Sequence, residues 1–347
     1  MHFDLMVKMS HNINGKKLFI IDENIKNKDM ELLSTEEIVV LTNRFDIYEQ
    51  LKTKKLNVYF KDFDLSIFPD NNFTQIFFRV SKEKAATHFI INNAERLLCK
   101  GGQLILCGEK NDGIKSYAET AAKSFNSPKN INKNRSIYLA SIRRSDQKNK
   151  CTPKIEADDN NYLSLRNCIP YLDHKLISKP GIFGWEKIDN GSKFLGDFIP
   201  DFLSLFNRKL KDILDLGCGY GYLSIRANSY TKAKITATDN NAAAISACTE
   251  NFLKLNINGE VIADDCAHNM NKLFDAIICN PPFHRGFETD KQLSKKFVNS
   301  SYDRLRKGGM ALFVVNCFVP IEKYTNKFLQ TKIIANNKSY RLILLIK

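Results

Sequence analysis

Glycine is scarce in the first part of this 347-residue chain, where Gly15 is the only one between Met1 and Lys100. A backbone that approaches a bound ligand closely usually needs glycine at that point, because a Cβ would hold the ligand away. The β-branched run at 38–41 predicts a strand, yet it leads into residues 42–44 without a glycine. The first part of the chain therefore lacks a loop suited to a nucleoside cofactor.

Metal-binding patterns are also missing. The nine cysteines include no CxxC pair, and the six histidines form no HExxH motif. Closely spaced ligands of this kind are typical of zinc sites, so we expect no metal. An odd number of cysteines favours a reducing compartment, and we expect Cys218 and Cys279 to serve as small fillers.

Long apolar runs are absent as well. No segment reaches 18 consecutive apolar residues, and the N-terminus has no apolar stretch of the signal-peptide kind. We therefore expect a cytoplasmic protein with no membrane partner.

Acidic side chains are outnumbered, with 52 Lys and Arg against 38 Asp and Glu, a formal net charge of +14 and a pI of about 9.2. Such an excess is typical of proteins that bind nucleic acid. Residues 1–160 hold 26 basic and 21 acidic side chains, and the rest hold 26 and 17, so the second part is the more basic. The stretch 123–154 has nine basic residues, one acid and few large apolar residues, which predicts a linker.

A glycine-rich segment, DLGCGYG at 215–221, follows a short apolar strand and precedes a helical stretch. A dinucleotide-binding loop would read GxGxxG, whereas the spacing here is GxGxG. With an acid two residues before the first glycine, this pattern favours a cofactor that has no pyrophosphate but carries a cationic amino-acid tail. A turn without a ligand is the alternative. The candidate residues are Asp215, Gly217, Gly219 and Gly221.

The next predicted strands also end in polar side chains. The alternating run 234–238 ends at Asp239, which lies about 20 residues past the glycines and can accept hydrogen bonds from both ribose hydroxyls. Asp239 and Asn240 could also cap the predicted helix at 242–255, and both roles are compatible. After a third strand we expect Asp265 to accept from an adenine amino group, with Asp264 a solvated neighbour.

The apolar strand 274–279 ends in Asn280-Pro281-Pro282-Phe283. An exocyclic amine on a purine is a poor nucleophile, because its lone pair is delocalised into the ring. The Asn280 side-chain oxygen and the Pro281 carbonyl can each accept one N–H and so aim the lone pair at a methyl donor. Two prolines stiffen the turn, and Phe283 offers a stacking face for the base. The segments together predict an S-adenosylmethionine-dependent N-methyltransferase.

The chain from Lys179 onward resembles the ribosomal RNA guanine-N2 methyltransferases of the RsmC type, which act on small-subunit RNA. The resemblance rests on PGIF at 180–183, DNGS at 189–192, the glycine loop, and NPPFH at 280–284 before Gly286. It implies a class I Rossmann-like domain, with a seven-stranded and mostly parallel sheet that has one antiparallel edge strand, for which 341–346 is suited. It also implies that the segment from Asp189 to Ser192, with Asp189 and Gly191 as binding residues, lies near the methionine end of S-adenosyl-L-methionine. Arg285 departs from the small or acidic residue expected there.

The first half echoes the second. Residues 95–106 (ERLLCKGGQLIL) match 302–313 (YDRLRKGGMALF) at a constant offset of 207, which predicts an internal duplication. The first half also resembles the degenerate methyltransferase domain that precedes the catalytic one in this family. We therefore expect two tandem Rossmann-like domains: 1–155, an RNA-positioning copy with its basic linker and no cofactor, and 156–347, the catalytic copy.

The expected partner is ribosomal RNA or the small ribosomal subunit, bound by a monomer. Several basic residues could meet phosphates near the target, and each could equally be a solvated helix face: Arg285, Lys291, Lys295, Lys296, Arg304, Arg306 and Lys307. Three alternatives stay open: a large-subunit RNA guanine-N2 methyltransferase, an N-methyltransferase of protein glutamine or adenine N6, and a catalytically silent RNA-binding assembly factor. His284 is a weaker candidate for a proton acceptor.

Overall fold

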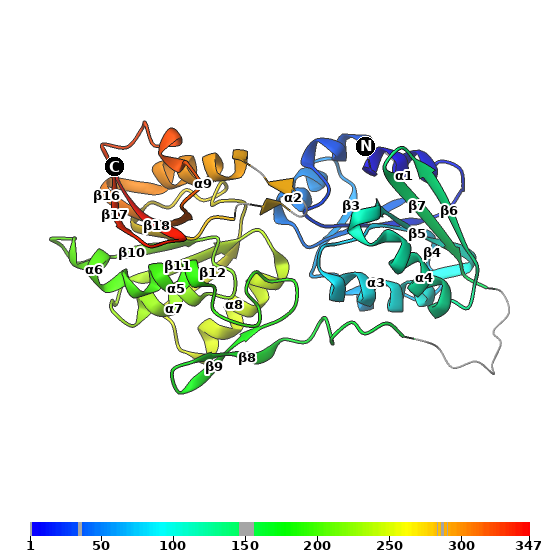
Figure 1. Ribbon diagram of the computed structural model, residues 1–347, viewed down its shortest axis with the longest axis horizontal. Helices are drawn as coiled ribbons and strands as arrows, with labels where there is room; N and C mark the ends of the chain where they lie inside the picture. Colours follow the sequence, from blue (N-terminus) through cyan, green and yellow to red (C-terminus); the bar gives the residue numbers. More distant parts are fainter. Residues whose placement is uncertain (1, 34–36, 146–155, 283, 286–287, 290) are drawn as a thin grey trace. The chain divides into compact units, whose positions relative to one another are not determined.

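The chain folds into two compact units, residues 1–164 and 165–347, each built on its own seven-stranded sheet (Figure 1). The computed structural model describes residues 2–33, 37–145, 156–282, 284–285, 288–289 and 291–347. The two sheets have the same strand order, so the predicted pair of tandem α/β domains is confirmed.

The sheet of the first unit has the order β3-β2-β1-β4-β5-β7-β6. Its first five strands run parallel, and β7 is antiparallel to both of its neighbours. The strands are β1 (Lys17–Ile21), β2 (Ile38–Thr42), β3 (Asn57–Phe60), β4 (Phe73–Arg79), β5 (Leu98–Glu109), β6 (Lys129–Asn134) and β7 (Ile137–Arg143). The helices are α1 (His2–Ser10), η1 (Asn27–Leu32), α2 (Phe45–Thr53), η2 (Leu65–Ile67), α3 (Lys84–Leu97), η3 (Lys110–Asp112) and α4 (Ile114–Ser124).

The second unit repeats this plan in the order β12-β11-β10-β13-β16-β18-β17. The predicted antiparallel strand is β18, which lies between β16 and the edge strand β17. The strands are β10 (Asp212–Leu216), β11 (Lys234–Asp239), β12 (Gly259–Ala263), β13 (Phe274–Cys279), β16 (Leu305–Asn316), β17 (Gln330–Asn336) and β18 (Tyr340–Ile346). Two hairpins are added, β8 (Arg166–Tyr171) with β9 (His174–Ser178) and β14 (His284–Arg285) with β15 (Glu288–Thr289). The helices are α5 (Asn190–Asp197), α6 (Ile199–Ser204), α7 (Tyr222–Asn228), α8 (Ala242–Lys254), α9 (Lys291–Arg304) and η4 (Ile321–Tyr324).

The central strands of the second unit are covered on both faces, which explains their continuous apolar sequences. All six residues of β13 are buried. Because successive side chains point to opposite faces, Ala276 and Ile278 join one core layer while Ile277 and Cys279 join the other. Helices α5, α7 and α8 cover the first face and α9 covers the second (Figure 1).

The duplication is visible in the elements themselves. Helix α3 and strand β5 have the same lengths as α9 and β16, at the offset of 207 seen in the sequence. In both units a glycine lies at the register shift with the neighbouring strand. A Cβ on Gly102 would lie 3.0 Å from the Thr74 carbonyl oxygen, and one on Gly309 would lie 3.0 Å from that of Asp275. Gly102 and Gly309 are therefore required by close backbone packing, whereas Gly101 and Gly308 before them have positive φ.

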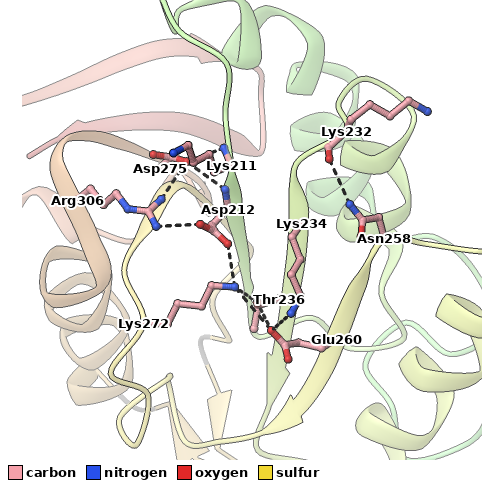
Figure 2. A network of polar contacts seen from close by, with 10 residues as sticks. All are labelled: Lys211, Asp212, Lys232, Lys234, Thr236, Asn258, Glu260, Lys272, Asp275 and Arg306. Atoms are coloured by element: carbon pink, nitrogen blue, oxygen red, sulfur yellow. Dashed lines mark hydrogen bonds and ion pairs between the residues drawn. The ribbon is translucent and has the colours of Figure 1, made fainter.

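A network of charged side chains lies at the start of the strands of the second unit (Figure 2). Lys272 is 2.9 Å from Asp212, and Arg306 is 2.8 Å from the other oxygen of that carboxylate. Arg306 also reaches the fully buried Asp275 at 3.0 Å, and its ion pairs raise the pKa of the guanidinium. These residues stand at the amino ends of the strands, opposite the edge where the glycine loop follows β10.

Candidate active site

Four polar motifs follow four neighbouring strands of the second sheet. Strands β12, β11, β10 and β13 are adjacent and parallel, so their carboxyl ends lie at one edge. The glycine loop follows β10, Asp239 ends β11, Asp265 comes after β12 and Asn280 comes after β13. Ligands of open α/β sheets bind at this edge. The fold thus brings together residues that are up to 65 positions apart in the sequence.

The three glycines of the loop all have positive φ, at 81° for Gly217, 55° for Gly219 and 90° for Gly221. Side chains are excluded at two of them by packing, since a Cβ would lie 3.1 Å from Phe297 at Gly217 and 2.8 Å from the Cys248 sulfur at Gly221. At Gly219 a Cβ would meet nothing within 4 Å. The middle glycine therefore exposes backbone to open space, as a ligand cradle requires.

The Asp239 carboxylate connects the loop to the next strand. One of its oxygens accepts from the Gly219 backbone N–H at 2.9 Å, and the other accepts from the Asn241 N–H at 2.8 Å. Asn241, not Asp239 or Asn240, is the N-cap of α8, and its side chain accepts from Ala243 N at 2.9 Å. The predicted capping role of Asp239 and Asn240 is therefore wrong by one or two positions. Asp239 orders the glycine loop while staying half-buried at the edge.

Asp215 lies under the loop and is fully buried. Its Oδ2 accepts from the Ser224 N–H at 2.9 Å and from the Ser224 hydroxyl at 2.7 Å, near the start of α7. Its Oδ1 has no hydrogen-bond partner among the described residues. Burial raises the pKa of Asp215 to about 7, and the two Ser224 bonds only partly oppose that shift. One oxygen of this buried carboxyl group is thus left to accept a hydrogen bond.

Asp265 faces a cavity of about 310 Å³ between the loop after β12 and helix α9. Its carboxylate accepts from the Asn240 side chain at 3.3 Å and forms an ion pair with Lys296 of α9. Asp264, predicted to be solvated, is 2% exposed, and both of its oxygens accept from Asn269 N. That prediction was wrong because the short connection to β13 folds back over Asp264.

Asn280 is held at the end of β13 by two residues from α5 and its N-cap. Its side-chain nitrogen donates to the Asp189 carboxylate at 3.1 Å and to the Ser192 hydroxyl at 2.8 Å. Asp189 caps α5 by accepting from Ser192 N at 2.8 Å. A carboxylate cannot donate, so the amide nitrogen must face it, and this leaves the Asn280 oxygen as the acceptor for a substrate.

The rest of the predicted NPPF motif is only partly described. Pro281 is buried and Pro282 is exposed, while Phe283 lies outside the described residues. Gly191 is packed against β18, since a Cβ there would lie 2.9 Å from the Tyr340 ring. A side chain at Gly191 would therefore displace that ring, and the place of Gly191 near the methionine end of the cofactor stays a prediction.

Three contacts of the site were not predicted. Ser192 belongs to the predicted DNGS segment and Lys296 to the predicted basic residues, but their contacts with Asn280 and Asp265 were not expected, and Ser224 was not a candidate. No local pattern indicates these contacts, because the partners meet only through tertiary folding.

The basic residues near this edge do not all remain available. Arg306, predicted to meet phosphates, is held by Asp212 and Asp275 at the other end of the strands, so that prediction was wrong. Lys295 and Arg304 line the cavity beside Asp265.

The thiols of Cys218 and Cys279 are buried, and burial raises the pKa of each well above the ordinary value of a thiol. In the part of the chain that the structure describes, no three metal-ligating side chains cluster, and no helix is long and apolar enough to cross a membrane.

The strand order, the glycine loop and the asparagine after β13 define a Rossmann-like methyltransferase fold. The chain belongs to the methyltransferase small domain family: the model of that domain matches residues 173–344, and the model of its N-terminal domain matches residues 4–154. Within the family it is of the RsmC type.

Two relatives and one solved structure illustrate the similarity. The ribosomal RNA small subunit methyltransferase C of Buchnera aphidicola subsp. Cinara cedri is 29% identical, covering 97% of this chain and 94% of that protein. The protein of the same name from Shewanella loihica is 25% identical, covering 91% of each. The T. thermophilus 16S rRNA N2 methyltransferase RsmC, solved with AdoMet and guanosine, has a TM-score of 0.78 at 20% identity, covering 100% of this chain and 91% of that one. This last match confirms the fold over the whole chain.

Proposed function

We propose that the protein transfers a methyl group from S-adenosyl-L-methionine to the exocyclic N2 amine of a guanine in 16S ribosomal RNA. The observation that carries the proposal is the orientation of Asn280, whose amide nitrogen is bound by Asp189 and Ser192. Its oxygen is thereby left as an acceptor, which suits an N–H of a planar amine. The names of the relatives and of the solved structure, all ribosomal RNA methyltransferases, support the RNA substrate.

The residues at the strand ends fit the cofactor. In this proposal Asp239 accepts from the ribose hydroxyls, with Asn240 beside it, and Asp265 accepts from the adenine amine. Their contacts with Gly219 and Asn240 at the same edge support these roles. The open space at Gly219 admits the ligand, and the buried Asp215 has one oxygen left to accept a hydrogen bond. When bound, the cofactor supplies an electrophilic methyl group on a positively charged sulfur.

The chemistry left to the protein is to position and activate the amine. The Asn280 oxygen and the Pro281 carbonyl each accept one N–H of the guanine amine, which draws the nitrogen towards a tetrahedral shape. Its lone pair then points at the methyl group. The Asn280 oxygen is oriented before the substrate arrives by the two bonds of its amide nitrogen, so little reorganisation of that acceptor is needed in the transition state. The methylated amine is acidic and loses its proton to water.

The target guanine must leave its stack to reach this edge. A guanine N2 in a paired helix faces its partner strand, so rotation of the nucleotide is required before Asn280 can contact it. In this proposal the first unit and the basic stretch 123–154 bind phosphates and set the position, in a cytoplasmic monomer. Deleting residues 1–155 should therefore abolish selective methylation, and RNA affinity should fall steeply with salt.

The test is methyl transfer by the full-length protein to 30S subunits and to 16S RNA, with the product nucleosides separated and identified. N2-methylguanosine at one position is expected. Methylation of adenine N6 or of a protein glutamine would contradict the proposed substrate class. Methylation of 23S RNA would assign the enzyme to the large subunit instead. Absence of AdoMet binding would favour the silent assembly factor.

A further inference from the structure

The two units can be aligned residue by residue at the edge where the cofactor is proposed to bind. Asp239 accepts from Asn241 N at 2.8 Å through its side chain, and its carbonyl accepts from Asp264 N at 3.0 Å. In the first unit Thr42 makes the same pair of contacts, accepting from Arg44 N at 3.1 Å and from Lys61 N at 3.0 Å. Arg44 and Asn241 are the N-caps of α2 and α8. Thr42 therefore stands where Asp239 stands.

The equivalence extends to the adenine side of the site. The residue after Lys61 is Asp62, so Asp62 stands where Asp265 stands. The next residues, Phe63 and Cys266, share an unusual left-handed backbone with φ of 53° and 56°. A phenylalanine or cysteine adopts this conformation rarely, so its recurrence at matched positions supports the alignment.

In the first unit this position is occupied by a side chain of the protein itself. The Tyr162 hydroxyl donates to Asp62 at 2.7 Å, and its ring stacks on Phe63 with centroids 6.3 Å apart and planes 26° apart. The Phe89 ring lies 5.6 Å away, and Phe89 is the 207-offset counterpart of Lys296. Tyr162 is 1% exposed. An aromatic ring with a donor thus faces the counterpart of the carboxylate proposed to receive the adenine amine.

The backbone before Tyr162 is held in the same groove. His88 Nδ1 lies 2.6 Å from the Asp158 carbonyl oxygen. Asn92 donates to the Ala157 carbonyl at 2.8 Å and accepts from Ala157 N at 2.9 Å. The counterparts of His88 and Asn92 at the offset of 207 are Lys295 and Asn299, which line the open cavity of the second unit. The groove that is open in one unit is filled by 157–162 in the other.

We propose that the first unit retains a purine-base pocket and that Tyr162 occupies it as a built-in ligand. This inference rests on the proposed function, in which Asp265 receives adenine. Thr42 in place of the ribose-binding acid, and the filled base pocket, together exclude the cofactor from this unit. Tyr162 also anchors the chain shortly before Arg166, where β8 of the catalytic unit begins.

The experiment is hydrogen exchange of the full-length Tyr162→Ala variant, read on α3 and on 157–164. The substitution should open the pocket and speed exchange there. Phenol, which restores the deleted atoms, and adenine, which brings its own amine donor for Asp62, should each slow exchange about tenfold at ten times their Kd. Benzene, which has no donor, and unsubstituted purine, which lacks the exocyclic amine, should protect less. In Phe125→Ala, a buried aromatic of the same core cluster, adenine should have no effect.

Protection by phenol without adenine would overturn the proposal, because the site would then be a tyrosine-shaped core cavity. Equal protection by phenol and benzene would overturn it too, since Asp62 would play no part. If Tyr162→Ala does not fold, Tyr162→Trp replaces it, with a purine-sized ring and an N–H donor. If Tyr162→Trp exchanges hydrogen at a rate within about threefold of the parent, the result supports a base pocket. If Tyr162 fills an ordinary core position, the larger ring overpacks it and exchange should be about tenfold faster or more. Methyl transfer by the parent is measured in parallel, so that a failure of the proposed function is distinguished from a failure of the base-pocket proposal.

Discussion

The Asn280 side chain donates to the Asp189 carboxylate at 3.1 Å, across 91 residues of sequence. The contact joins the end of β13 to the N-cap of α5, and it decides which atom of the amide faces the open edge of the sheet. A residue that caps a helix therefore also sets the polarity of the proposed catalytic acceptor.

Replacing Asn280 with alanine should lower methyl transfer by about 10²-fold or more and leave AdoMet affinity nearly unchanged, because its oxygen acts on the substrate amine. Single-turnover methylation and calorimetric titration separate the two effects. A large loss of AdoMet affinity would show that Asn280 belongs to the cofactor site instead.

Asn280→Asp should lower kcat/KM more than so small a change in shape suggests, because it places a second carboxylate against Asp189 at the 3.1 Å contact. The reciprocal change Asp189→Asn should recover part of the loss, since the new amide nitrogen can donate to the new carboxylate. The recovery is incomplete because Ser192 N contacts the same Asp189 oxygen and would lose its acceptor. A double-mutant cycle on kcat/KM measures the coupling. If the double variant is no better than Asn280→Asp, the contact does not orient the acceptor.

Asp239→Ala should weaken AdoMet binding by about 10²-fold or more, because it removes the proposed ribose acceptor and the bond that orders Gly219. Thr42→Ala is the matched control at the equivalent position of the first unit, and it should leave AdoMet affinity unchanged. The parent should bind one AdoMet per chain in calorimetry. Two sites in the parent, or a loss in Thr42→Ala, would contradict a single catalytic copy.

The stability of the second unit should depend on pH through Asp215, whose pKa is raised from 3.8 to about 7 by burial. Between these values the folded state holds a proton that the unfolded state has lost. The free energy of unfolding should therefore fall as pH rises from about 4 to about 7, by up to about 4 kcal/mol, and then level off. Asp215→Asn should flatten that fall.

Urea denaturation followed by the fluorescence of Trp185, the single tryptophan, reports this unit in the parent and in Asp215→Asn. The difference between the two pH profiles is the quantity that matters, because other groups also titrate. Parallel profiles would mean that the folded protein accommodates the Asp215 charge.

Arg306→Ala should destabilise the second unit by roughly 1–3 kcal/mol, because it takes a cation from the buried Asp275. It should leave the affinity for RNA nearly unchanged. Lys307→Ala is the neighbouring control: Lys307 is exposed, so its removal should hardly change stability. If Lys307 contacts a phosphate, the salt dependence of RNA binding should drop by about one unit of log slope. The reverse pattern would restore Arg306 to the RNA-binding surface.

Much of the plan could be predicted from local sequence. The apolar runs before Gly217, Asp239 and Asn280 predict buried parallel strands, whereas the pairing of β13 with β10 instead of β12 came only from the tertiary structure. The offset of 207 predicted the duplication, and the missing glycines predicted that only one copy carries the ligand loop. These features depend only on residues that are close together in the chain, so they can be read from the sequence alone.

Tertiary structure decided the contacts between residues far apart in the chain. No local sequence pattern indicates that Arg306 forms ion pairs with Asp212 and Asp275, or that Ser224 donates to Asp215. Nor does the sequence around Tyr162 predict a ring buried against Asp62, 100 residues away. Each of these contacts exists because burial leaves a carboxylate without water, and the folded chain supplies whichever donor lies within reach.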